Sequence, residues 1–228
     1  MAWNLKSKEE LKEFLDNLGI EYRYGCFSEK NPELCHLLGE YLHVVKSDFQ
    51  KAARIYKTNC DDYNHPRSCH AYGNYAILGK GQEKQSIETA YKYYLKACEL
   101  DSEPSCFNAG IIAMRGDANI NREKDYTKGL ALVDKACTLN HMNACYYLSG
   151  LYISGTSDKV IDKDMKQAFK YSERACKLGN SYACSNVSIM YKKGDGVEKD
   201  EKMSEKYRKL ADQLSIKLEP EREDDSVI

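Results

Sequence analysis

The sequence has almost no net charge, because 34 lysines and arginines stand against 35 aspartates and glutamates. Such a balance provides no basic surface for nucleic acid or for an anionic membrane. Long apolar runs are absent as well, and none approaches the roughly 20 residues that a membrane-spanning helix needs. Proline is scarce at 4 residues, whereas 18 tyrosines help raise the aromatic content to 11%. This composition predicts an ordered, soluble chain.

The short motifs of several enzyme and metal-binding classes are also missing. No CxxC pair occurs, which removes the usual zinc knuckle and the thioredoxin-type redox motif. Neither a GxSxG nucleophile elbow nor a GxxxxGK[ST] phosphate loop is present. The SxxK, SDN and KTG motifs of serine β-lactamases do not occur either. We therefore expect neither a catalytic site nor a metal site.

Cysteine, by contrast, is abundant. The ten cysteines are Cys26, Cys35, Cys60, Cys69, Cys98, Cys106, Cys137, Cys145, Cys176 and Cys184. They alternate between short and long intervals, and the first member of each pair recurs after 34, 38, 39 and 39 residues. This is the period of a helix-pair solenoid. An even number of cysteines at regular spacing is also typical of a disulfide framework in an oxidising compartment.

Small residues recur in register with the cysteines. Four positions after the second cysteine of each pair stand Gly39, Gly73, Gly110, Ser149 and Ser188. Glycine inside a helix costs about 1 kcal/mol relative to alanine, so its recurrence indicates the close approach of a neighbouring helix. Small residues also stand eight positions before a first cysteine, as Ala52, Ala90, Gly129 and Ala168. Helix ends are expected at Gly79, Gly116, Gly155 and Gly194, where glycine suits a left-handed cap.

Together with GDGVEKDEKMSEKYRKLA at 194–211, these positions resemble the Sel1-like repeat. The resemblance implies an all-α fold, an α/α solenoid of about five tetratricopeptide-related helix pairs stapled by disulfides. We expect a repeat array over residues 30–214, with units that begin near residues 35, 69, 106, 145 and 184. An N-terminal capping helix is expected within 1–29, with Leu5, Leu11, Phe14, Leu15 and Leu18 along one side. The acidic tail 215–228 is expected to be disordered.

Two regular disulfide connectivities fit the spacing. Bridges either cross the short loops or join the two helices of one repeat, as in Cys35–Cys60, and the second scheme leaves Cys26 and Cys184 without partners. In the last unit KYRKLADQL aligns with KYSERACKL, so that Asp212 stands where Cys176 stands and no further helix follows to supply a partner. The ends of the array therefore favour the short-loop scheme. It predicts the pairs Cys26–Cys35, Cys60–Cys69, Cys98–Cys106, Cys137–Cys145 and Cys176–Cys184.

Histidine raises the question of a cofactor. His36 and His70 each follow the second cysteine of a pair directly, a doublet that suggests haem or copper ligation. We expect instead that both side chains lie on the exposed side of a helix start. The sequence thus assigns no cofactor, and haem is kept as the alternative ligand.

The first twenty residues bear on the compartment. They lack the apolar core of a secretory signal peptide, and Glu9, Glu10, Glu13 and Asp16 are foreign to an Arg-rich matrix presequence. A cysteine-rich chain without either signal fits the mitochondrial intermembrane space, where oxidation traps incoming proteins. The alternative is a chain with reduced thiols in the cytoplasm.

The whole pattern closely resembles the cytochrome c oxidase assembly factor 7 family. The resemblance is carried by EYRYGCFSEKNPELC, by NCDDYNHPRSC and by ERACKLGNSYACSNVSIMYKKGDGVEKDE. It implies a protein of the mitochondrial intermembrane space that supports assembly of respiratory complex IV.

We therefore expect a non-catalytic scaffold that binds protein partners, either complex IV subunits or other assembly factors. A haem-binding or thiol–disulfide factor acting on assembly subunits is the alternative. A β-lactamase-like hydrolase ranks below both, and it is considered because C-x7-C helix pairs also resemble the Helicobacter cysteine-rich proteins.

Overall fold

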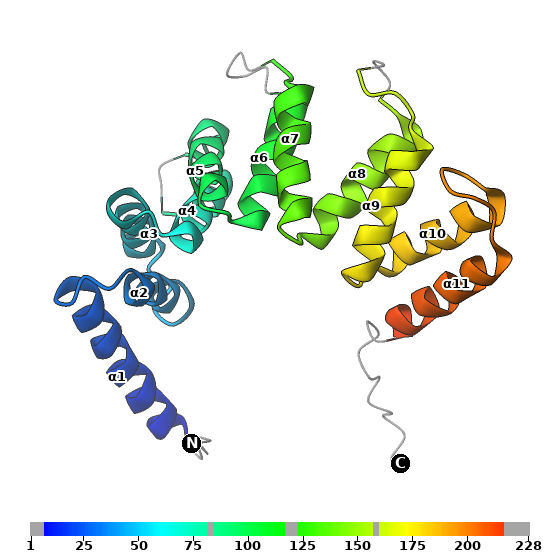
Figure 1. Cartoon of the computed structure of the whole chain (residues 1–228). Coiled ribbons are helices and arrows are strands. Elements are labelled where there is room, and N and C mark those ends of the chain that lie inside the picture. Colours follow the sequence, from blue (N-terminus) through cyan, green and yellow to red (C-terminus); the bar gives the residue numbers. More distant parts are fainter. Residues whose placement is uncertain (1–6, 82–83, 117–122, 157–159, 217–228) are drawn as a thin grey trace. The chain divides into compact units, whose positions relative to one another are not determined.

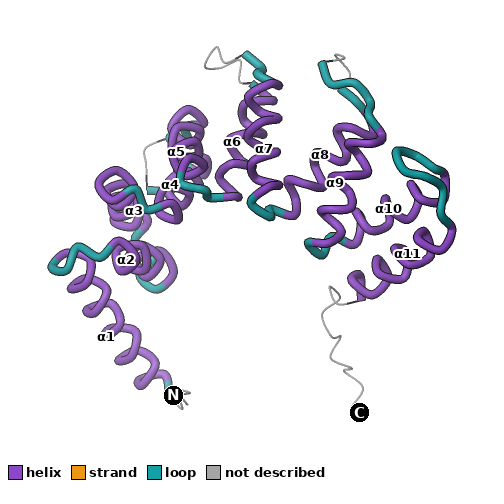
Figure 2. The backbone as a smooth tube through the Cα atoms, in the orientation of Figure 1, coloured by secondary structure: helices purple, strands orange, loops and turns teal. Residues whose placement is uncertain are grey.

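The computed structural model describes residues 7–81, 84–116, 123–156 and 160–216, and these residues form eleven α-helices and no strand (Figure 1). The helices are α1 (Lys8–Phe27), α2 (Pro32–Val44), α3 (Phe49–Tyr63), α4 (Pro66–Leu78), α5 (Ile87–Glu99), α6 (Glu103–Arg115), α7 (Tyr126–Thr138), α8 (Met142–Ser154), α9 (Met165–Lys177), α10 (Ser181–Lys193) and α11 (Glu201–Ile216). Figure 2 shows the described loops, such as those that join α1 to α2, α2 to α3 and α10 to α11. The predicted all-α architecture is confirmed. Within the described ranges, no helix is long and apolar enough to cross a membrane.

The chain divides into two compact units, and the division falls within α6, after Ile112. In the first unit α1 packs on α2, α2 on α3, α3 on α4 and α4 on α5. In the second unit α7 packs on α8, α8 on α9, α9 on α10 and α10 on α11. Each of these helices is thus covered by its neighbours in sequence, as in an array of stacked helix pairs.

The helices begin and end in register with the sequence repeat. The first helix of every pair starts three residues before its cysteine, at Pro32, Pro66, Glu103, Met142 and Ser181. Glycine ends four of these helices, and every one has a positive φ that disfavours other residues. Gly79 and Gly194 adopt the left-handed helical conformation, whereas Gly116 and Gly155 combine a positive φ with an extended ψ. The helix ends predicted from glycine are therefore correct, although the cap has two conformations.

Small residues allow close helix contacts, as predicted from their recurrence. At Gly73 of α4, an added Cβ would lie 2.5 Å from Cε1 of Tyr94 in α5, and Gly39 meets the ring of Tyr56 in the same way. In the second unit the small positions are serines, and Ser149 Oγ lies 2.5 Å from Ser172 Oγ. The small residue thus receives a large ring at Gly39 and Gly73, and it has a hydroxyl partner at Ser149.

Disulfides cross the short loops between consecutive helix pairs. The structure joins Cys26 to Cys35, Cys60 to Cys69, Cys98 to Cys106, Cys137 to Cys145 and Cys176 to Cys184. Their Cα atoms are 4.4–4.8 Å apart, and the cysteines are between 0% and 7% exposed. Each loop turns at one residue of positive φ, which is Lys30, Asn64, Asp101, Asn140 or Gly179. Four bridges therefore fix the second helix of one pair against the first helix of the next, and Cys26–Cys35 fixes the capping helix α1 against the first pair.

The predicted terminal segments are described only in part. The capping helix α1 begins at Lys8, and Leu5 lies outside the described residues. Helix α11 continues to Ile216 and so includes the first two residues of the expected tail, while 217–228 lie outside the described residues.

Candidate functional site

Two histidines contact serines of the following repeat. Nδ1 of His36 lies 3.0 Å from Ser68 Oγ, and Nδ1 of His70 lies 2.7 Å from Ser105 Oγ. The predicted exposure is wrong for His36, which is 4% exposed, and His70 is half-buried. The position after the second cysteine faces the first helix of the next pair, so these imidazoles lie against protein. In the sequence, this contact is indicated by a serine that stands directly before the second cysteine of the following pair.

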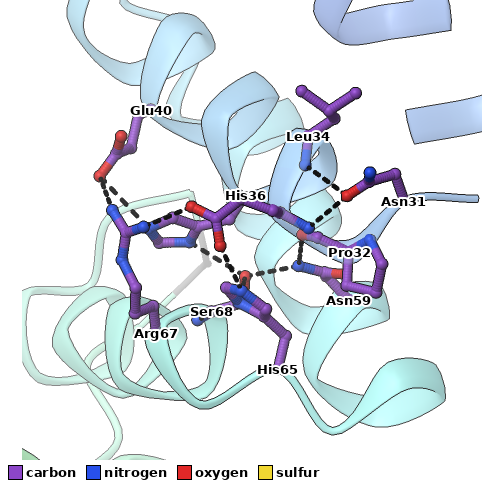
Figure 3. A network of polar contacts seen from close by, with 10 residues as sticks. Asn31, Pro32, Leu34, His36, Glu40, Asn59, His65, Arg67 and Ser68 are labelled. Atoms are coloured by element: carbon purple, nitrogen blue, oxygen red, sulfur yellow. Dashed lines mark hydrogen bonds and ion pairs between the residues drawn. The ribbon is translucent and has the colours of Figure 1, made fainter. Parts of the chain in front are cut away.

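The bonds around His36 define its tautomer (Figure 3). Its Nε2 lies 3.2 Å from Oε1 of Glu40, and a carboxylate can accept but not donate a hydrogen bond. Nε2 therefore carries the proton, and Nδ1 accepts from the hydroxyl of Ser68. The Nδ2 group of Asn59 donates to Ser68 Oγ at 2.7 Å and to the carbonyl of Pro32 at 2.8 Å. One continuous network thus joins α2, α3 and α4.

Charged groups surround this buried imidazole. Arg67 forms ion pairs with Glu33 at 2.5 Å and with Glu40 at 3.4 Å, and His65 Nε2 lies 3.0 Å from Glu33. The hydrogen bond from His65 is the main cause that lowers the pKa of Glu33. Burial, followed by the nearby Arg67 and His65, lowers the pKa of His36 from 6.5 to about 4. His36 is therefore neutral at neutral pH.

This network forms one wall of a groove of about 470 Å³ in the first unit. The other walls come from Tyr56 of α3, from the face of α4 that bears His70 and Asn74, and from the loop between α5 and α6. Pro66, Pro104, Ala71 and Leu100 supply apolar surface, and Glu40, Arg67, Asp101 and Glu103 supply charge. The groove therefore offers packing surfaces, charges and hydrogen-bonding groups, as protein-binding sites do.

Two further histidines, which the sequence did not single out, also have structural partners. His43 packs edge-on against Phe49 and Tyr75, and Nδ1 of His141 accepts from the backbone of Ala144 at the start of α8. In the described part of the chain, no group of three or more histidine, cysteine, aspartate or glutamate side chains is placed to hold a metal ion. The ten cysteines are all within the described part, and all are in disulfides.

Asn59, Ser68 and Arg67 were not singled out from the sequence. Asn59 had a detectable signal, because it stands directly before a first cysteine, where later repeats have Ala97, Ala136 and Ala175. A buried asparagine in place of alanine needs hydrogen-bond partners, and Asn59 is 1% exposed. Arg67 had no such signal, since an arginine at a helix start is ordinary on a solvated surface.

Comparisons with known proteins agree with this geometry. The Sel1 repeat profile matches residues 20–58, 66–102, 104–141, 143–180 and 181–211. A crystal structure of a Sel1 repeat protein from Oxalobacter formigenes superposes with a TM-score of 0.63 at 24% identity, covering 78% of this chain and 68% of that chain. At this identity the superposition shows a shared fold.

Curated relatives match over about half of the chain. The cytochrome c oxidase assembly factor 7 homolog of Drosophila melanogaster is 42% identical over 134 residues, which is 57% of this chain and 50% of the relative. Cytochrome c oxidase assembly factor 7 of Danio rerio is 40% identical over 118 residues, which is 50% of this chain and 52% of the relative. The chain spans about half the length of the curated relatives it matches. Because the repeat profile covers most of its length, in register with the helix pairs and cysteines, the chain belongs to the Sel1 repeat family.

Proposed function

We propose that this chain is a protein-binding assembly factor of the mitochondrial intermembrane space that supports assembly of cytochrome c oxidase. The observation that carries the proposal is the 42% identity over 134 residues to the Drosophila melanogaster assembly factor 7 homolog. The relatives from several vertebrates carry the same description, which supports one role for the matched region.

The disulfides support an oxidising location for the working protein. Each of the five bridges is buried, and each closes a loop between two helix pairs. Such bridges persist where thiols are oxidised, and they are rare where glutathione and thioredoxin keep thiols reduced. We infer that the chain carries these five bridges in the intermembrane space.

The groove beside His36 supports binding of a protein partner. Helix-pair arrays commonly act by presenting an extended surface to another protein. The groove combines apolar patches with charged groups that are already held by ion pairs, such as Arg67 with Glu33 and Glu40. We infer that a segment of a complex IV subunit or of another assembly factor binds there.

Complementation tests this function. Drosophila melanogaster cells depleted of their own assembly factor 7 homolog would express this chain, and cytochrome c oxidase activity would be measured in isolated mitochondria. Expression is expected to restore the activity. Failure of a folded, mitochondrially located chain to restore any activity would contradict the proposal.

A matched pair of variants links the activity to the groove. Ala71 is a half-buried residue of the groove, and Asn186 occupies the same position of the repeat in α10. Ala71→Arg is expected to fill the groove and abolish rescue, while Asn186→Arg retains it. Equal thermal unfolding of the two variants would show that the loss is one of binding.

The haem-binding and thiol–disulfide alternatives gain no specific observation. A haem ligand at His36 would have to replace the bonds from this imidazole to Ser68 and Glu40. A thiol–disulfide reaction would have to reach cysteines that are at most 7% exposed.

A further inference from the structure

A second groove lies in the first unit, between the end of α1 and the start of α3. Its volume is about 630 Å³, and Leu38 and Leu42 of α2 line it together with Phe27 of α1 and Ile55 of α3. Phe27 is 63% exposed and Ile55 is half-buried. The groove therefore has apolar surface that the chain itself leaves uncovered.

Comparison of the repeats explains why this space is open. In the second unit a tyrosine bridges each pair of consecutive second helices: Tyr171 donates to Asp134 at 2.7 Å, and Tyr207 donates to Glu173 at 3.1 Å. Both tyrosines are 7% exposed. The same two positions at the junction of α1 and α3 are occupied by Ile55 in place of tyrosine and by Arg23 in place of the acid. Isoleucine is shorter than tyrosine and has no hydroxyl, so the bridge is missing and a groove remains.

The rim of this groove is positively charged. Arg23, Lys46, Lys51 and Arg54 line it, against the single carboxylate of Asp48. Lys46 is paired with Asp16 and Lys51 with Asp48, each at 2.8 Å. Within the described residues, Arg23 and Arg54 are exposed and form no ion pair. Both are close enough to a lysine-paired carboxylate to help lower its pKa, Arg23 for Asp16 and Arg54 for Asp48. The rim thus carries four cations against these two carboxylates, an excess of positive charge in a chain whose net charge is −1.

We propose that this groove binds an acidic peptide segment of a partner protein. A large apolar side chain of the segment enters between Phe27 and Ile55, and flanking carboxylates pair with Arg23 and Arg54. The apolar side chain of the partner then takes the place that the tyrosine ring has in the second unit. The carboxylates of the partner take the place of the acidic residue with which that tyrosine pairs. A peptide is favoured over an anionic membrane, because Lys46 and Lys51 are already paired with Asp16 and Asp48, which leaves two arginines where membrane surfaces are bound by clusters of about four or more free cations. The inference follows from this groove alone and does not depend on a role in complex IV assembly.

Fluorescence polarisation with defined peptides tests the proposal on the full oxidised chain. The probe is a fluorescein-labelled peptide with Phe-Leu at its centre and Asp or Glu at all other positions. Two comparison peptides replace Phe-Leu by Ala-Ser or replace all acids by lysine. The acidic Phe-Leu peptide is expected to bind about tenfold or more tightly than either comparison peptide, since both the anchor and the charge contribute. Equal or absent binding of the three peptides would overturn the proposal.

Charge reversal locates the binding. Arg23→Glu with Arg54→Glu is expected to weaken the acidic peptide at least about tenfold. Lys170→Glu is the matched control, because Lys170 is exposed at the position in α9 that Arg54 occupies in α3. Binding that survives the double reversal, or falls equally with Lys170→Glu, would overturn the proposal. Vesicles that contain 30% phosphatidylserine are tested in the same way. If they bind through the two arginines while the peptide does not, the ligand is a membrane and the proposal is overturned.

A filled groove gives a second test, in which the apolar space is removed together with one of the two arginines. Ile55→Tyr combined with Arg23→Asp rebuilds the pair formed by Tyr171 and Asp134. The double variant is expected to unfold at the same temperature as the native chain or a higher one, and to lose peptide binding at least about tenfold. Peptide binding that is unchanged in this stable variant would contradict the proposed position of the ligand.

Discussion

His36 is a single side chain that connects three helices of the first unit. It belongs to α2, its Nδ1 accepts from Ser68 of α4, and Asn59 of α3 donates to the same hydroxyl. Because the imidazole is buried and neutral, the network acts without a net charge at its centre. Oδ1 of Asn59 is buried without a hydrogen-bond partner, so the network depends on its remaining bonds. A proton on Nδ1 removes the acceptor of the Ser68 hydroxyl and disrupts it.

The lowered pKa of His36 predicts a pH-dependent stability. The folded pKa is about 4 and the unfolded value is 6.5, so the unfolded chain takes up a proton first as the pH falls. The contribution of His36 is therefore present above pH 6.5 and is lost between pH 6.5 and pH 4. Urea unfolding of the native chain and of His36→Gln is expected to show that the native advantage shrinks by about 2 kcal/mol between pH 7.5 and pH 5. A constant difference across this range would contradict the buried, neutral assignment.

Two glycines in different surroundings are predicted to change the free energy of unfolding in opposite directions when each is replaced by alanine. Gly73 lies against the Tyr94 ring, whereas an added Cβ at Gly150 of α8 would have nothing within 4 Å. Gly73→Ala is expected to lower the free energy of unfolding by about 1–3 kcal/mol, because the buried ring must move. Gly150→Ala is expected to raise it by up to about 1 kcal/mol through helix propensity. Chemical unfolding followed by circular dichroism measures both, and destabilisation by Gly150→Ala would contradict the account.

At the level of residues, the sequence predicted the features that recur in every repeat and missed the features that occur in only one or two repeats. Gly73 was identified because glycine or serine recurs at that position in every repeat. The burial of His36 was missed, because histidine stands there in the first two repeats alone and its partner Ser68 is 32 residues away. The groove beside Phe27 was also missed, since it depends on what Ile55 and Arg23 replace in the other repeats.

At the level of helices, the chain is built from one pair repeated with small changes. The first helices all begin three residues before a cysteine, and a positive-φ residue turns every short loop. Helix existence and order were predictable because cysteine, glycine and the apolar period all agree. Helix α11 follows the same register. Asp212 stands there at the position of a first cysteine, so α11 forms no disulfide.

One disulfide can be removed without touching the rest of the array. Replacing Cys98 and Cys106 together by alanine opens a loop of sequence separation 8. The free energy of unfolding is expected to fall by about 2.5 kcal/mol, because the unfolded chain gains the freedom that the bridge had removed. Helix content at low temperature should be unchanged, since α5 and α6 keep their own hydrogen bonds. An unchanged unfolding transition would show that this bridge does not contribute to stability.

At the level of the whole molecule, five disulfides are distributed evenly along the chain. Four bridges each join one helix pair to the next, and Cys26–Cys35 joins α1 to the first pair, so that none of these junctions depends on packing alone. The fold, the repeat family and the likeness to assembly factor 7 proteins were all accessible from the sequence. The identity of a partner was not, because surface grooves bind through side chains that no repeat constrains.

The central claim is that the chain works as an oxidised solenoid in the mitochondrial intermembrane space. Its most direct test is submitochondrial fractionation of cells that express the chain, followed by a gel-shift count of thiols alkylated before and after reduction. The account predicts a chain in the intermembrane-space fraction with none of its ten cysteines alkylated before reduction and all ten alkylated afterwards. A cytoplasmic chain with free thiols would contradict both the disulfide framework and the proposed role in complex IV assembly.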